Sequence, residues 1–139
     1  NIPISDAEAL WLAYMLPWLP DIADYPVLVV DYERLVDAPL RQLRRIAKHL
    51  GVAIDPTDVE IAEYTSSFVD DGLRHQMQED TLGDDGQPTL ADQTYAELLK
   101  LAKSSKPWSR RAAWRRCLHL AHGYRAEANR ATRADRPRN

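Results

Sequence analysis

Residues 25–52, YPVLVVDYERLVDAPLRQLRRIAKHLGV, decide the fold that the sequence predicts. The continuous apolar run Val27 to Val30 lies between a proline and Asp31, which is typical of a strand buried on both faces. A helix is expected to follow, with Pro39 in its first turn, where a missing N–H costs nothing. Gly51 can end that helix in the left-handed conformation. The stretch therefore predicts a strand, a turn and a helix.

Helical spacing of apolar residues predicts further helices on both sides of this stretch. We expect helices over about 5–16, over about 38–50, after Asp55, over about 89–103 and over about 107–132. The first is expected to begin with a capping box of Ser5 and Glu8. The second is expected to be capped by Asp37 and to turn an apolar stripe inward, formed by Leu40, Leu43, Ala47 and Leu50. No second convincing strand is present. The expected fold class is mostly α-helical with one short buried strand.

The composition of the 139 residues, 45% of them hydrophobic, is that of one globular folded unit. The single cysteine, Cys117, excludes an internal disulfide framework and a cluster of thiolates for zinc, and it is expected to be a small buried filler. No run approaches the roughly 18 apolar residues of a membrane span, and no signal-peptide pattern opens the chain. A cytoplasmic location is expected.

Charge divides the chain unevenly. Residues 1–102 hold 7 Lys/Arg against 19 Asp/Glu, a net charge of −12, whereas residues 103–139 hold 11 against 2, a net charge of +9. We therefore expect a main part over 1–102, with an exposed loop at about 78–88, and a basic helical tail over 103–139. Such a tail is expected to lie against an acidic surface.

The stretch around Asp31-Tyr32-Glu33 resembles the strand, Tyr-Glu-x-Leu, proline, helix and Leu-Gly signature in the C-terminal half of sulfotransferases that use 3′-phosphoadenosine 5′-phosphosulfate. The downstream sequence YTSSFVDDGLRHQ, residues 64–76, is similar to bacterial members of that family. The resemblance covers about residues 1–76. It implies the C-terminal portion of an α/β three-layer, P-loop-like fold, with a strand whose neighbours lie in the other half.

The resemblance also implies a role for four side chains as contacts of the donor's adenine. Tyr32 follows the strand, and Thr65, Ser66 and Phe68 match a Thr-Ser-Phe segment of the family. This chain has one serine more than that segment, so the resemblance leaves open whether Thr65 or Ser66 takes the role. Arg34 stands where the family has an acidic residue.

The family's phosphosulfate-binding loop, rich in Gly, Ser and Thr and carrying a lysine, has no match among the five glycines of this chain. Its catalytic base and the groups that hold the 3′-phosphate belong to the same N-terminal half. The resemblance therefore implies part of an enzyme that transfers a sulfuryl group to a hydroxyl or amine of a small-molecule, glycan or lipid acceptor without a metal. Alone, this part is expected to be inactive and to need the missing half or self-association.

Other interpretations stay open. Tyr32 and Glu33 have an alternative structural role as packing and capping residues, and Arg74-His75 is a weak candidate for an acid-base pair. His119 and His122 stand three residues apart on a helix, but no Asp or Glu is placed beside them as in zinc-binding HExxH helices. A solvated or core-edge position is therefore expected for both, and not a metal site. The alternative function is a stand-alone helical interaction module whose basic helix binds an acidic partner or surface. A membrane surface is less favoured, and nucleic acid is not expected.

Overall fold

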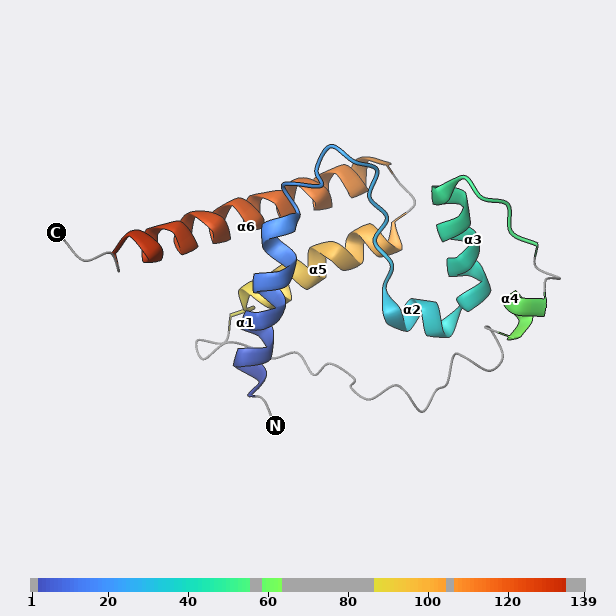
Figure 1. The fold of residues 1–139 in the computed structure, drawn as a ribbon, viewed down its shortest axis with the longest axis horizontal. Coiled ribbons are helices and arrows are strands. Elements are labelled where there is room, and N and C mark those ends of the chain that lie inside the picture. Colours follow the sequence, from blue (N-terminus) through green and yellow to red (C-terminus); the bar gives the residue numbers. More distant parts are fainter. Residues whose placement is uncertain (1–2, 56–58, 64–86, 105–106, 135–139) are drawn as a thin grey trace. The chain divides into compact units, whose positions relative to one another are not determined.

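The computed structural model describes residues 3–55, 59–63, 87–104 and 107–134. These residues form mostly helices, as the sequence predicts, and Figure 1 shows their order. The chain divides into two compact units, which are Asn1–Val27 with Asp80–Asn139, and Leu28–Glu79. The predicted loop at 78–88 falls almost entirely outside the described residues.

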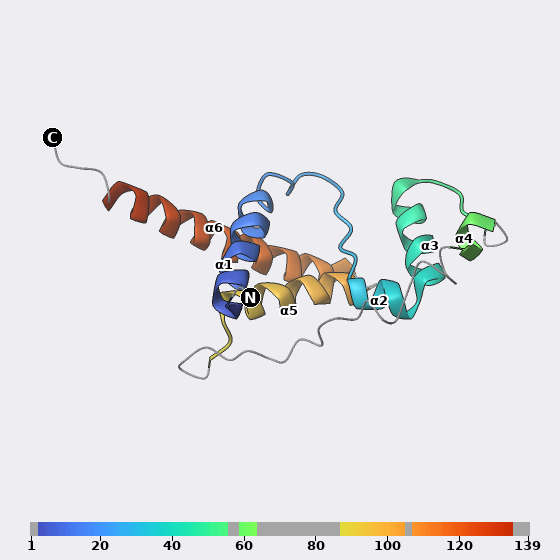
Figure 2. The same ribbon diagram turned by 60° about the horizontal axis from the view of Figure 1, so that its bottom comes forward.

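The first unit is built on the helices α5 (Leu90–Lys103) and α6 (Pro107–Ala134), which run antiparallel and side by side in Figures 1 and 2. Both helices match the predicted spans. Thr89 and Asp92 form a full capping box at the start of α5: Thr89 Oγ1 accepts from the Asp92 N–H, and Asp92 Oδ2 accepts from the Thr89 N–H.

Small side chains bring α6 close to its neighbours. Ala113, Cys117 and Ala121 repeat every four residues and are almost completely buried. Leu98 and Leu101 of α5 are buried as well, and among the described charged residues of the two helices Glu97 is the one that is buried. The α5–α6 pair therefore forms a dry seam with short side chains on the α6 side.

The N-terminal segment completes this unit with the helix α1 (Ile4–Met15) and the 3₁₀ helix η1 (Leu16–Trp18). α1 packs against α5, and η1 packs against α6. Leu12, Leu16 and Leu19 are buried there. Ser5 does not cap α1, contrary to prediction. Pro3 precedes the helix in an extended conformation, and its carbonyl accepts from two N–H groups of the first turn, so Ser5 lies inside the helix.

The second unit contains the helices α2 (Tyr32–Asp37), α3 (Pro39–Leu50) and α4 (Val59–Glu63). α3 ends as predicted. Gly51 has φ 70° and ψ 22°, the Val52 N–H donates to the Ala47 carbonyl at 2.9 Å, and the Gly51 N–H donates to the Lys48 carbonyl at 3.4 Å. Together these bonds form a Schellman motif, which satisfies carbonyls that a helix end would leave free.

The prediction of a buried strand at Val27 to Val30 is wrong for the described residues. No strand is assigned anywhere in the described ranges, and Val27 and Val30 are each 37% exposed. A β-branched run favours extended backbone, but a ladder also needs a second segment to accept and donate its hydrogen bonds. No such partner segment occurs in the part of the chain that the structure describes.

One prediction for α3 is also wrong, and another holds only in part. Asp37 does not cap it, because the chain is already helical from Tyr32 to Asp37 and breaks at Ala38, the residue before a proline, which disfavours the helical conformation. The inward stripe holds only in part. Leu50, in the last turn, is 66% exposed, whereas Gln42 is 2% exposed and its Oε1 accepts from Arg45 Nη1 at 3.2 Å.

Candidate functional site

The candidate site starts at Asp31, which turns extended backbone into helix. Asp31 has φ −89° and ψ 132°, and its Oδ1 accepts from the Arg34 N–H at 3.2 Å. Its carbonyl accepts from the Leu35 N–H at 3.0 Å. Aspartate is a preferred N-cap because its carboxylate satisfies an N–H that the first helical turn leaves free. The sequence Asp-Tyr-Glu-Arg therefore places Tyr32 as the first residue of α2, not in a loop beyond a strand.

Tyr32 lies on the outside of this turn. Its side chain is 56% exposed, while Val36, one turn later, is 8% exposed and anchors α2. Glu33 is also exposed, and its negative charge in the first turn suits the positive end of the helix dipole. The turn thus presents a flat ring with a hydroxyl group, which can stack on a planar base and form a hydrogen bond.

The other predicted adenine contacts lie outside the described residues. These are Thr65, Ser66 and Phe68. Arg74 and His75, the weak candidate for an acid-base pair, lie outside the described residues as well. The structure therefore describes Tyr32 alone among the four candidate donor-binding residues.

One further polar group lies near this turn. Arg34 Nε is buried without a hydrogen-bond partner in the structure. Arg34 is in α2, where the resembling family has an acidic residue. His49 is exposed in the last turn of α3, near the negative end of the helix dipole.

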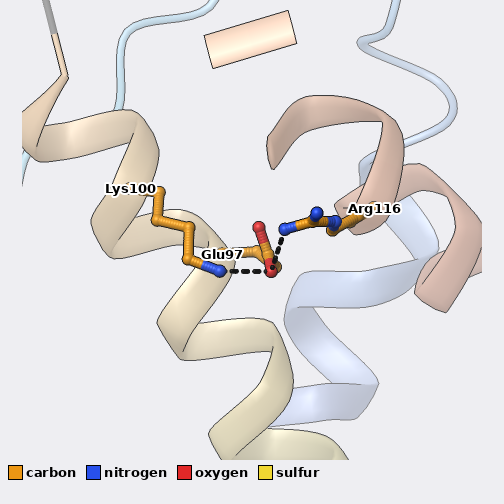
Figure 3. A network of polar contacts seen from close by, with 3 residues as sticks. All are labelled: Glu97, Lys100 and Arg116. Atoms are coloured by element: carbon orange, nitrogen blue, oxygen red, sulfur yellow. Dashed lines mark hydrogen bonds and ion pairs between the residues drawn. The ribbon is translucent and has the colours of Figure 1, made fainter. Parts of the chain in front are cut away.

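Glu97 is the polar residue that the sequence analysis missed. It lies on the buried side of α5 and is only 8% exposed. Figure 3 shows its Oε1 between Lys100 Nζ, at 2.6 Å, and Arg116 Nη1 of α6, at 3.2 Å. Its Oε2 is buried and has no partner. The available signal was spacing, because Glu97 stands three residues after Thr94 and four before Leu101, both on the buried stripe.

Cys117 is a buried filler, as predicted. It is 0% exposed, and burial, followed by the negative charge of Glu97, raises the pKa of its thiol to about 11. A buried thiol with a raised pKa is a poor nucleophile. Cys117 therefore fills the α5–α6 seam and is not placed for nucleophilic chemistry.

Two arginines of the basic helix α6 make polar contacts with other described parts of its unit. Arg116 reaches Glu97, and Arg125 donates to Asp21 Oδ2 at 2.8 Å and to the Pro17 carbonyl. This agrees in part with the expectation that the tail lies against an acidic surface, since Glu97 and Asp21 both belong to the acidic part of the sequence. His119 and His122 are exposed, and no group of metal-ligating side chains occurs within the described ranges.

Among the helices of the described ranges, none has the length and apolar character required to cross a bilayer. No protein-family profile, curated protein or solved structure matches this chain.

Proposed function

We propose that this chain is part of a sulfotransferase that uses 3′-phosphoadenosine 5′-phosphosulfate, and that Tyr32 lies against the adenine of the donor. The observation that carries the proposal is the Asp31-capped turn, which holds the Tyr32 ring 56% exposed immediately after an extended segment. It supports the role because a base can stack on this ring without any rearrangement of the turn.

The valines that precede the turn support the same proposal. Val27 and Val30 are partly exposed on extended backbone that has no ladder partner among the described residues. In the proposed enzyme, a segment outside this sequence supplies neighbouring strands and buries these side chains. The same segment supplies the loop that binds the phosphosulfate, since anion binding needs several converging N–H groups.

The proposed reaction is an in-line sulfuryl transfer. A base takes the proton of the acceptor hydroxyl or amine, the acceptor atom forms a bond to sulfur, and the bond between sulfur and the phosphate oxygen breaks. The products are the sulfated acceptor and 3′-phosphoadenosine 5′-phosphate. The described residues of this chain contribute adenine binding to this reaction and not the base.

Calorimetric titration of 3′-phosphoadenosine 5′-phosphate into the full-length gene product tests the proposal. Loss of base stacking costs roughly 1–3 kcal/mol, so Tyr32→Ala is expected to raise the Kd about fivefold to 150-fold. Tyr32→Phe should keep most of the affinity, because the ring remains. Tyr14→Ala is the matched control, since Tyr14 is equally an exposed helical tyrosine, at 69%. No binding by the folded wild-type protein would refute the proposal.

A further inference from the structure

The exposed face of α6 carries four basic or titratable side chains in a row. Arg111, Arg115, His119 and His122 are all exposed. At 3.6 residues per turn they fall within an arc of about 80°, and at 1.5 Å per residue they span about 16 Å along the helix. We call these four residues the α6 stripe.

The α6 stripe is free within the described part of the chain. Among the described residues, the ion pairs of α6 are made by Arg116 and Arg125, and no side-chain hydrogen bond or ion pair involves the four stripe residues. The apolar side of α6 is occupied, since Ala113, Cys117 and Ala121 are buried where the helix packs against α5 and η1. Among the described residues, therefore, nothing neutralises the charges of Arg111 and Arg115.

We propose that the α6 stripe binds an acidic protein segment that presents carboxylates about one helical turn apart. Carboxylates at that spacing match the guanidinium groups of Arg111 and Arg115, and each arginine can bind a carboxylate through two N–H groups. Small exposed residues, Ala112, Gly123 and Ala126, lie beside the stripe and let a second helix approach.

Two other anionic partners fit less well. A bilayer-bound helix needs a free apolar face to insert, whereas in α6 Ala113, Cys117 and Ala121 are buried and Trp114 and Leu118 are partly covered. Nucleic acid is disfavoured by overall charge, because residues 1–102 carry a net charge of −12, which repels its long run of phosphates. A short acidic segment contacts the stripe alone.

Fluorescence anisotropy with a labelled helical peptide that carries glutamates at one-turn intervals tests this proposal. The expected result is saturable binding that weakens as NaCl rises from about 50 to about 200 mM. Arg111→Gln/Arg115→Gln should weaken binding by roughly twofold to thirtyfold, because two exposed ion pairs are lost. Arg111→Lys/Arg115→Lys should lose less than the glutamine variant, because the charge remains while the paired N–H geometry is lost, and circular dichroism verifies that each variant is folded.

The matched control is Arg41→Gln/Arg44→Gln, which removes the same charge from exposed positions of α3 and should leave binding unchanged. An equal loss in this control would overturn the proposal, as would the absence of peptide binding. Preferential binding of single-stranded oligothymidylate, or of phosphatidylserine vesicles, through Arg111 and Arg115 would also overturn it. None of these outcomes depends on donor-nucleotide binding, so this test and the Tyr32 test fail independently.

Discussion

The same substitution, glycine to alanine, is expected to have opposite effects at Gly51 and Gly123. An added Cβ would meet nothing within 4 Å at either position, so crowding plays no part. Gly51 has φ 70°, and an L-residue in the left-handed region costs roughly 1–2 kcal/mol. Alanine recovers about 0.4–1 kcal/mol of this by restricting the unfolded chain. Gly51→Ala should therefore destabilise the protein by about 1 kcal/mol.

Gly123 lies inside α6, where alanine is the better helix former by about 1 kcal/mol. Gly123→Ala should stabilise the protein by about 0.5–1 kcal/mol. Thermal unfolding followed by circular dichroism at 222 nm measures both effects, with a shift of about 3 °C for each kcal/mol in a chain of this size.

The control is Gly51→Asn, because asparagine tolerates the left-handed region and should lose less than alanine. A Tm for Gly51→Ala that equals or exceeds the wild-type value would refute the assignment of Gly51 as the residue that ends α3.

Three further predictions concern the first unit. Cys117 should resist iodoacetamide at pH 8 until the protein unfolds, and rapid alkylation of the native protein would contradict its burial. The pKa of its thiol is about 11 in the folded protein and near 9 in the unfolded chain, so the free energy of unfolding should fall as the pH rises from about 9 to about 11. Cys117→Ala should show less of this fall. Thr89→Ala should destabilise by about 1 kcal/mol in urea unfolding, while Thr89→Ser, which keeps the hydroxyl, should lose less; equal losses would exclude the capping box. Arg125→Gln should destabilise the protein by about 1 kcal/mol in the same assay, because it loses the hydrogen bonds to Pro17 and Asp21. Arg130→Gln, on the exposed end of α6, should have almost no effect. Similar values for the two variants would show that the bonds of Arg125 do not stabilise the protein.

Helices were predictable where local chemistry determines their ends. Thr89 caps α5 with its own side chain, and Gly51 ends α3 by its backbone freedom, so both boundaries can be read from neighbouring residues. The extended run Val27 to Val30 was different, because a strand depends on a second segment that the local sequence does not contain. Asp31 and Asp37 are both good caps, and only the helical conformation between them reveals which one is used.

The candidate site was predictable only in part. The resemblance singles out Tyr32, and its position in the first turn of α2 follows from the Asp31 cap, at a residue where the sequence predicts the end of a strand. The buried carboxylate of Glu97 was missed because a charged residue on an apolar stripe is easily assigned to the exposed face. Its burial depends on the reach of Arg116 from α6, which is a tertiary contact.

The most direct test of the central claim is photo-crosslinking of the full-length gene product with the 8-azido derivative of 3′-phosphoadenosine 5′-phosphate, followed by tryptic digestion and mass spectrometry. The account predicts a label, removed by excess unmodified nucleotide, on the peptide that contains Tyr32 and ends at Arg34. A label that excess nucleotide removes and that lies on α6, or anywhere outside this peptide and the peptide 49–74 that contains Thr65 and Phe68, would contradict the proposed donor site.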